Sequence, residues 1–158
     1  RFLKDCGYER YEISNYAKPG RECRHNIGYW TGIEYLGLGL GASSYIQGFR
    51  FHNESDLSLY DKIQMNGTDA DERLHQEITK LSDKEKMEEF MFLGLRMIKG
   101  VSGSEFFQRF GQNMWNVYGN VLNKLKDEGL IIVDMPDVRL SDYGIDVSNY
   151  VLAQFLED

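Results

Sequence analysis

The residues with the clearest chemical potential lie in one short stretch, Cys23-Arg24-His25-Asn26-Ile27-Gly28-Tyr29-Trp30. It combines an imidazole, an amide and flat apolar rings, which together could ligate an iron and enclose a planar macrocycle. A structural role is the alternative: His25 would hydrogen-bond a loop carbonyl, while Tyr29 and Trp30 would fill a gap in the core. These residues by themselves leave both interpretations open.

Glycine then occupies every second position, at Gly37, Gly39 and Gly41, just before Ala42. The continuous apolar character predicts a strand over Tyr35–Leu40 that is buried on both faces. Glycine weakens a strand unless another backbone or a flat ligand must come close. We therefore expect this segment to line a cavity for a planar guest such as a nucleobase, or to pack tightly against another backbone. The spacing is not the dinucleotide-binding fingerprint.

The two cysteines and the charge distribution limit the kinds of site and partner that we expect for this protein. Cys6 and Cys23 are too few and too far apart for a disulfide framework or a paired-cysteine metal motif, and buried, reduced thiols of a cytoplasmic protein are expected. Residues 1–50 hold seven Lys/Arg and five Asp/Glu, a balance of +2, which suits an anionic, carboxylated ligand. Residues 101–158 hold four and nine, a balance of −5, which argues against nucleic acid as a partner.

Composition predicts a globular protein, with 42% hydrophobic and 13% aromatic residues. No apolar run is long enough for a membrane span, and no secretory signal is recognisable. The chain starts at Arg1 with what looks like the last turn of a helix ending at Gly7. It is therefore expected to be a fragment of a longer protein.

The first half of the chain predicts a series of short elements. They are a strand over 8–14, a turn at Pro19-Gly20, a loop or helical piece around 25–30, an extended segment over 44–53 broken at Gly48, a helix over 56–65, a turn at 66–69 and a strand over 75–81.

The second half predicts three helices, a hairpin and a closing helix, which is the order of a winged helix. Ser82 and Glu85 form a capping-box pattern at the start of the first helix. The third helix carries only Lys124 and Lys126 as cations, so an interaction role is favoured over DNA binding. The predicted elements are helices over 82–100, 105–110 and 112–128, strands over 130–133 and 138–140, and a helix over 141–156.

Several motifs resemble the oxygen-independent coproporphyrinogen III oxidases and their heme-chaperone (HemW-type) branch. In the first half these are Tyr11-Glu12-Ile13-Ser14-Asn15-Tyr16-Ala17-Lys18-Pro19-Gly20, His25-Asn26-Ile27-Gly28-Tyr29-Trp30 and Tyr35-Leu36-Gly37-Leu38-Gly39-Leu40-Gly41-Ala42. In the second half they are Phe92-Leu93-Gly94-Leu95-Arg96, Gly100-Val101-Ser102 and Leu125-Lys126-Asp127-Glu128-Gly129-Leu130-Ile131.

The resemblance implies an α/β remnant, the closing strands of a radical SAM partial TIM-like barrel, followed by an α+β winged-helix-like C-terminal domain. The implied division is 1–68 for the barrel part, 69–81 for a linker and 82–158 for the C-terminal domain. Open strand edges of a partial barrel would favour self-association of the chain.

The resemblance also implies cofactors. Family members use S-adenosylmethionine and a 4Fe-4S cluster bound by three closely spaced cysteines, which this chain lacks, so by itself it should be catalytically inactive and hold no cofactor stably. By similarity, Gly39, Gly41 and Ala42 would contact S-adenosylmethionine. His25, Asn26, Tyr29 and Trp30 would contact heme, with His25 as the candidate iron contact.

The chain departs from the oxidase pattern at two positions, which favours the chaperone branch. Proteins of that branch bind heme and deliver it to apoproteins. Oxidases tend to carry aspartate where this chain has Ser14 and arginine where it has His25. The alternative function is oxidative decarboxylation of coproporphyrinogen III to protoporphyrinogen IX. A DNA-binding winged helix is a third, weaker alternative.

Overall fold

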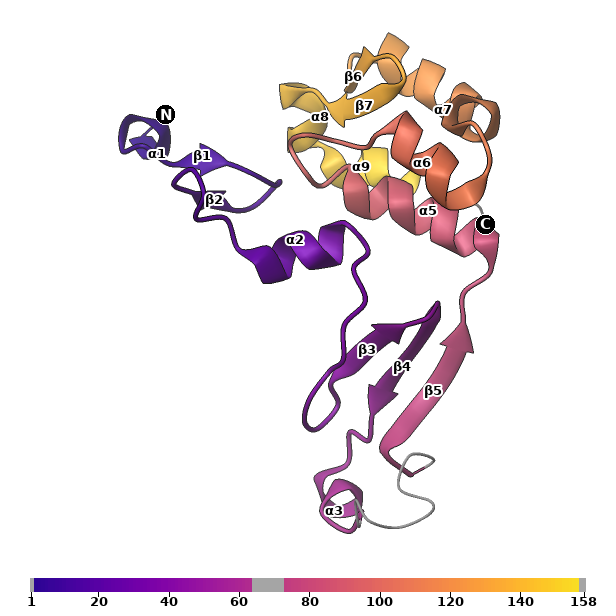
Figure 1. The fold of residues 1–158 in the computed structure, drawn as a ribbon. Helices are drawn as coiled ribbons and strands as arrows, with labels where there is room; N and C mark the ends of the chain where they lie inside the picture. The colour runs from indigo at the N-terminus through magenta and orange to yellow at the C-terminus, as the bar shows by residue number, and fades with distance from the viewer. Residues whose placement is uncertain (1, 64–72, 157–158) are drawn as a thin grey trace. The chain divides into compact units, whose positions relative to one another are not determined.

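The computed structural model describes residues 2–63 and 73–156 (Figure 1). The chain forms two compact units. The larger unit combines residues 1–32 with 83–158, and the smaller unit is residues 33–82. The structure is mixed α/β, as predicted, but the described strands pair only antiparallel, in three small sheets, and close no barrel.

Three helices build most of the larger unit. In α5 (Asp83–Gly94), Met87 and Met91 lie one turn apart and are buried. Helix α6 (Gly103–Phe110) ends at Gly111, whose φ of 67° is the left-handed conformation of a glycine stop. Helix α7 (Met114–Asp127) begins after Asn113, whose side chain accepts a hydrogen bond from the Trp115 amide. All three predicted helices are present, although the first, predicted to reach residue 100, ends at Gly94.

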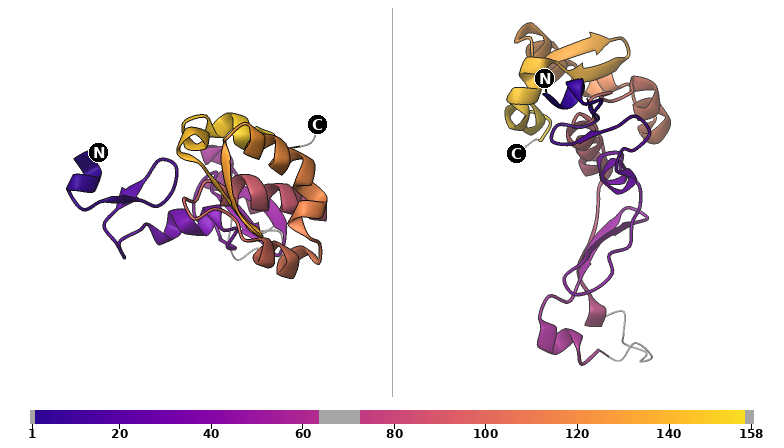
Figure 2. Two further views of the ribbon diagram at one scale, coloured as in Figure 1. Left: turned by 90° about the horizontal axis from the view of Figure 1, so that it is seen from above. Right: turned by 90° about the vertical axis from the view of Figure 1, so that its left-hand side faces the viewer.

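A hairpin and two short helices complete this unit (Figure 2). Strands β6 (Ile131–Asp134) and β7 (Asp137–Leu140) pair antiparallel, as predicted. The single closing helix predicted for 141–156 is instead α8 (Asp142–Asp146) and α9 (Ser148–Ala153). The break falls at Val147, whose φ of −111° and ψ of 28° are not helical. The order of elements agrees with the prediction, while the winged-helix class itself stays a prediction.

The main apolar cluster of the larger unit takes all its buried members from the C-terminal part. Every buried member of the main apolar cluster falls between positions 87 and 155. The members are Met87, Met91, Leu95, Val101, Phe106, Met114, Tyr118, Leu122, Leu125, Leu130, Ile131, Val138, Leu140, Val151, Leu152 and Phe155.

The N-terminal part of this unit is built of short elements, α1 (Phe2–Asp5), β1 (Glu9–Arg10), β2 (Tyr16–Ala17) and α2 (Arg24–Trp30). The strand expected over 8–14 is thus limited to β1. The segment that follows β1 pairs with the residues just after α5. Glu12 and Met97 form an isolated antiparallel β-bridge, and the Ile13 amide donates a hydrogen bond to the Arg96 carbonyl at 3.0 Å. These bonds attach the N-terminal part to the helical core.

The smaller unit is a three-stranded sheet of β3 (Ser43–Ile46), β4 (Phe49–Asn53) and β5 (His75–Lys80), in that order. Gln47 and Gly48 turn between β3 and β4 with φ of 51° and 78°, which explains the predicted break at Gly48. Helix α3 (Leu57–Tyr60) occupies part of the helix predicted over 56–65. The turn predicted at 66–69 lies outside the described residues.

The strand predicted over Tyr35–Leu40 is wrong. Apart from a bridge between Tyr35 and Tyr45, the segment is a loop. Leu36, Leu38 and Leu40 are exposed by 56%, 84% and 44%, so the segment is not buried on both faces. The continuous apolar character predicted a paired, buried strand, whereas the backbone here is held by side chains of the neighbouring hairpin.

The structure also bears on the expectations about the cysteines and about membrane-spanning helices. Cys6 and Cys23 are exposed free thiols, so the expectation of buried cysteines is wrong. Among residues 2–63 and 73–156, every helix falls short of the length and apolar character that a membrane crossing requires.

Candidate functional site

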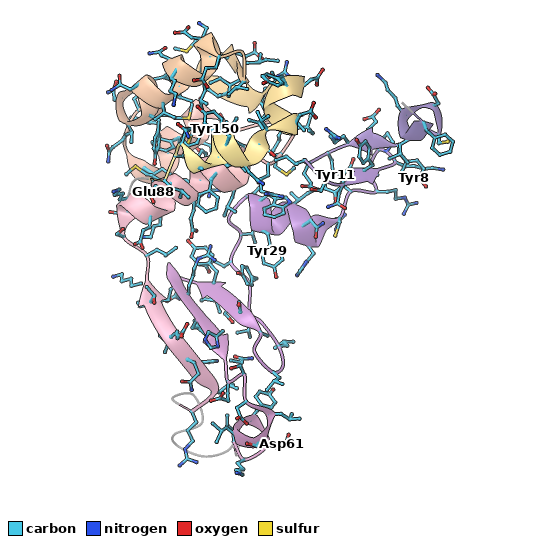
Figure 3. All side chains as sticks on the ribbon, turned by 180° about the vertical axis from the view of Figure 1, so that it is seen from behind. Tyr8, Tyr11, Tyr29, Asp61, Glu88 and Tyr150 are labelled. Carbon is cyan, nitrogen blue, oxygen red and sulfur yellow. The ribbon has the colours of Figure 1, made fainter. Side chains whose placement is uncertain are left out.

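Helix α2 carries the predicted heme-contacting residues. Its seven residues include His25 in the first turn and Tyr29 one turn later, on the same face. The two rings meet edge to face, with centroids 4.7 Å apart and planes at 87°. Figure 3 labels Tyr29 on this helix.

The His25 imidazole is exposed and forms no hydrogen bond with a described residue. The structural alternative, in which this ring satisfies a loop carbonyl, is therefore not seen. An accessible imidazole without a hydrogen-bond partner keeps its nitrogen lone pair available for a metal. The side chain thus has the donor chemistry that a heme iron requires.

Trp30, at the other end of α2, is half-buried against a cation. The Arg96 guanidinium carbon lies 4.3 Å from the centroid of the Trp30 ring. A planar guanidinium over an indole is favourable because the ring face is electronegative. Trp30 therefore belongs to the stretch that could contact heme and also has a structural role, because it packs against Arg96.

A second arginine contacts the same end of α2. Arg109 donates from Nη2 to the carbonyl oxygen of Thr31, the C-cap residue, at 3.2 Å. Its guanidinium also bonds Glu105 Oε1 at 2.6 Å, one turn earlier on α6. A cation at the C-terminal end of a helix interacts favourably with the unpaired carbonyls there.

In the smaller unit, two buried polar side chains hold the loop that contains Gly37, Gly39 and Gly41, here called the glycine loop. Asn53 Nδ2 donates to the carbonyls of Gly37 and Gly39 at 3.2 Å and 2.8 Å, and Ser44 Oγ accepts from the Gly37 amide at 3.0 Å. Asn53 and Ser44 are 4% and 1% exposed. The sequence offered no signal for these two residues.

The glycines of this loop serve different purposes. A Cβ at Gly37 would collide with the Ser43 carbonyl oxygen, so close backbone packing requires glycine there. A Cβ at Gly39 would meet nothing within 4 Å, and the φ of this residue is 98°. The backbone at Gly39 is therefore accessible to a ligand, while Gly37 follows the packing interpretation.

The predicted site residues therefore fall into two sets. His25, Asn26, Tyr29 and Trp30 share α2 in the larger unit, and Gly39, Gly41 and Ala42 share the loop of the smaller unit. Their assignment as ligand contacts stays a prediction.

Sequence reasoning missed a fully buried carboxyl and a surface pocket in the larger unit. Glu12 is 0% exposed; its Oε1 accepts from the Ser14 amide at 3.0 Å, whereas Oε2 has no hydrogen-bond partner among the described residues. The pocket, of about 510 Å³, lies around α1, β1 and β2. It is lined by Phe2, Leu3, Lys4, Tyr8, Glu9, Arg10 and Tyr16.

The cluster ligands that the resemblance implies do not fit the described residues. No group of three or more His, Cys, Asp or Glu side chains that could hold a metal occurs among them. Cys6 and Cys23 are two thiols, fewer than the three closely spaced cysteines that the resemblance implies. A 4Fe-4S cluster would therefore need ligands other than these side chains.

Comparison with known proteins identifies the relatives. Residues 81–147 match the HemN C-terminal domain. The heme chaperone HemW of Lactococcus lactis is 36% identical over 96% of this chain, and that of Bacillus subtilis 36% over 95%. This chain is therefore similar to the HemW heme chaperones. It spans 38% of the length of either protein.

A solved structure agrees with this relationship at the level of the fold. The coproporphyrinogen III oxidase HemN of Escherichia coli superposes with a TM-score of 0.71, covering 98% of this chain and 38% of that one. Only 17% of residues are identical, so the likeness concerns the fold alone. The HemN C-terminal domain match includes Arg96 and Arg109 but not α2, which these two side chains contact.

Proposed function

We propose that this chain is part of a heme chaperone, which binds heme at α2 and delivers it to apoproteins. The observation that carries the proposal is the exposed, hydrogen-bond-free imidazole of His25 within the His-Asn-x-x-Tyr-Trp stretch. The HemW chaperones to which the chain is similar support it.

The residues of α2 can divide the work of holding a porphyrin. His25 supplies a nitrogen ligand for the iron, and the Tyr29 ring at its side supplies apolar surface. Arg24 precedes His25 and is exposed, so its charge can attract heme propionates. Heme is the cargo here, and the chain's part is to bind and orient it.

The glycine loop is proposed to contact S-adenosylmethionine in the full-length protein. The Gly39 amide donates no hydrogen bond to a described residue, and the space beside its Cα is open. An adenine edge could accept from this amide at close range. Gly41 and Ala42 would continue the same backbone surface.

The test is heme titration of the full-length protein and its His25→Ala variant, followed by the Soret band. Loss of an iron ligand should shift the band and weaken heme binding at least about tenfold. His75→Gln is the matched control, because His75 packs against Phe51 in the sheet of the smaller unit. Unchanged affinity and spectrum in His25→Ala would refute heme ligation by this residue.

The second candidate function is coproporphyrinogen III oxidation, which the shared fold with HemN favours. Ser14 stands where the oxidases tend to carry an aspartate, and its amide is used within the chain by Glu12. Anaerobic assay of the full-length protein with its cluster reconstituted decides the point. Formation of protoporphyrinogen IX would establish the oxidase, and its absence at full cluster loading would remove it.

A further inference from the structure

Helix α2 is too short to be stable without outside support. It has seven residues, none of them buried, and the side chain of its N-cap residue, Cys23, makes no capping hydrogen bond. Isolated helices of this length are unfavourable in water because nucleation costs more than a few hydrogen bonds return. Its conformation must therefore depend on tertiary contacts.

Those contacts come from the C-terminal helices, at one end of α2. Arg96 follows α5 and stacks on Trp30, while Arg109 of α6 donates to the Thr31 carbonyl. Each arginine is itself fixed: the Arg96 carbonyl accepts from the Ile13 amide, and Glu105 bonds the Arg109 guanidinium. The Arg96 side chain has no ion pair or hydrogen bond to a described residue, so the indole is its partner.

The opposite end of α2 carries the exposed His25. Trp30 lies five positions further along the helix, about 7.5 Å along its axis. Because a helix turn is rigid, holding Trp30 and Thr31 fixes the direction and the distance at which the imidazole is presented. The two arginines thus act on His25 through the helix without contacting it.

We propose that the C-terminal domain is the support of the heme-binding helix, with Arg96 as a positioning residue that acts through Trp30 and Arg109 as a second fastening at Thr31. The proposal rests on the function proposed above for α2. It assigns the C-terminal domain a task in cargo binding that does not require this domain to touch heme.

The experiment compares Arg96→Leu, Arg96→Lys and the control Arg139→Leu in the full-length protein. Arg139 is a surface arginine of the same domain, 3.8 Å from Asp134 on the hairpin. In Arg96→Leu we expect heme affinity to fall about tenfold, the effect of losing a desolvated cation–π contact. The Soret maximum should stay in place because His25 remains the ligand. Arg96→Lys should lie between the two, and Arg139→Leu should match wild type.

A second readout needs no heme. In the 158-residue chain carrying Trp115→Phe, Trp30 is the single tryptophan, since this chain has two. Arg96→Leu should shift its emission to the red and speed amide exchange over residues 24–31. This readout distinguishes the proposed support of α2 from the proposed heme ligation by His25. If His25→Ala leaves heme binding unchanged while these changes occur, heme ligation fails but the support of α2 stands.

A double-mutant cycle tests the route of action. In a Trp30→Phe background, Arg96→Leu should cost little further heme affinity if Arg96 works through the indole. A full, additive loss would show a direct contact with the cargo and overturn the positioning role. Unchanged emission, exchange and affinity in Arg96→Leu would overturn the inference altogether. Should Arg96→Leu fail to fold, Arg96→Lys decides by the same three measurements.

Discussion

At the residue scale, His25 and Trp30 show that one short helix can present contrasting environments. His25 is exposed and unbonded, whereas Trp30 is half-buried beneath Arg96. A cargo-binding ligand must be accessible, while the residue that fixes its position must not move. The distribution of burial along α2 therefore matches a division between contact and support.

His52 of the smaller unit gives a pH-dependent prediction. Its Nδ1 donates to the Asn53 carbonyl at 2.8 Å, which, with the nearby Glu77 carboxylate, raises its pKa above the usual 6.5. The folded state then holds the proton more tightly than the unfolded chain. The stabilisation is complete below about pH 6.5 and is lost as the pH rises through the raised pKa.

The prediction is tested by titrating the His52 ring by NMR. Glu77→Gln should lower the His52 pKa but leave it above the usual value, because the Asn53 carbonyl remains. Glu54→Gln, which removes a weaker and more distant charge, should move the His52 pKa less. A larger shift in Glu54→Gln than in Glu77→Gln would contradict this order of causes.

At the element scale, two helical glycines make opposite predictions. In α7 a Cβ at Gly119 would meet nothing within 4 Å, whereas in α8 a Cβ at Gly144 would collide with the Leu130 carbonyl oxygen. Gly119→Ala should raise the free energy of unfolding by about 0.5–1 kcal/mol through helix propensity. Gly144→Ala should lower it by about 1–3 kcal/mol, because backbone atoms must shift.

Urea denaturation followed by far-UV circular dichroism measures both changes. The two variants add the same methyl group to a helix of the same unit, so each is the control for the other. Equal effects of the two substitutions would show that local packing does not decide the cost at these positions.

Periodicity predicted the long elements of the chain because their apolar residues decide their burial. Met87 and Met91 on α5, Leu95 directly after it, and Tyr118, Leu122 and Leu125 on α7 are all buried, as the helical spacing predicts. The same reasoning gave a wrong prediction for the glycine loop. Its continuous apolar character predicted a buried strand, yet Asn53 and Ser44 hold its backbone through bonds that span up to 16 positions.

The candidate site was predictable only in part, for a similar reason. Local composition singled out His25 and its neighbours, because the relevant residue types adjoin one another. No local pattern shows that Arg96 and Arg109 contact the end of α2, since Arg109 bonds a carbonyl 78 residues away. Glu12 likewise gives no sign in the sequence that it is fully buried.

At the scale of the whole molecule, the distribution of the core implies that the C-terminal part can fold by itself. All buried members of the main cluster lie between Met87 and Phe155, and the N-terminal part adds only Ile13, partly buried, at its surface. A segment of 81–158 exceeds the roughly 55–65 residues at which many domains fold alone. The match to the HemN C-terminal domain falls in this same segment.

We therefore predict that the isolated segment 81–158 unfolds cooperatively on heating, followed by circular dichroism, while a segment of residues 1–80 does not. The first keeps the apolar cluster. The second loses Arg96 and Arg109, which contact Trp30 and Thr31, and with Arg96 the carbonyl that accepts from the Ile13 amide. Segment 81–158 should also leave the heme spectrum unchanged, because it lacks His25. A Soret shift with 81–158 alone would place a heme site in the C-terminal domain, and its role would then be to bind the cargo rather than to hold the helix that does.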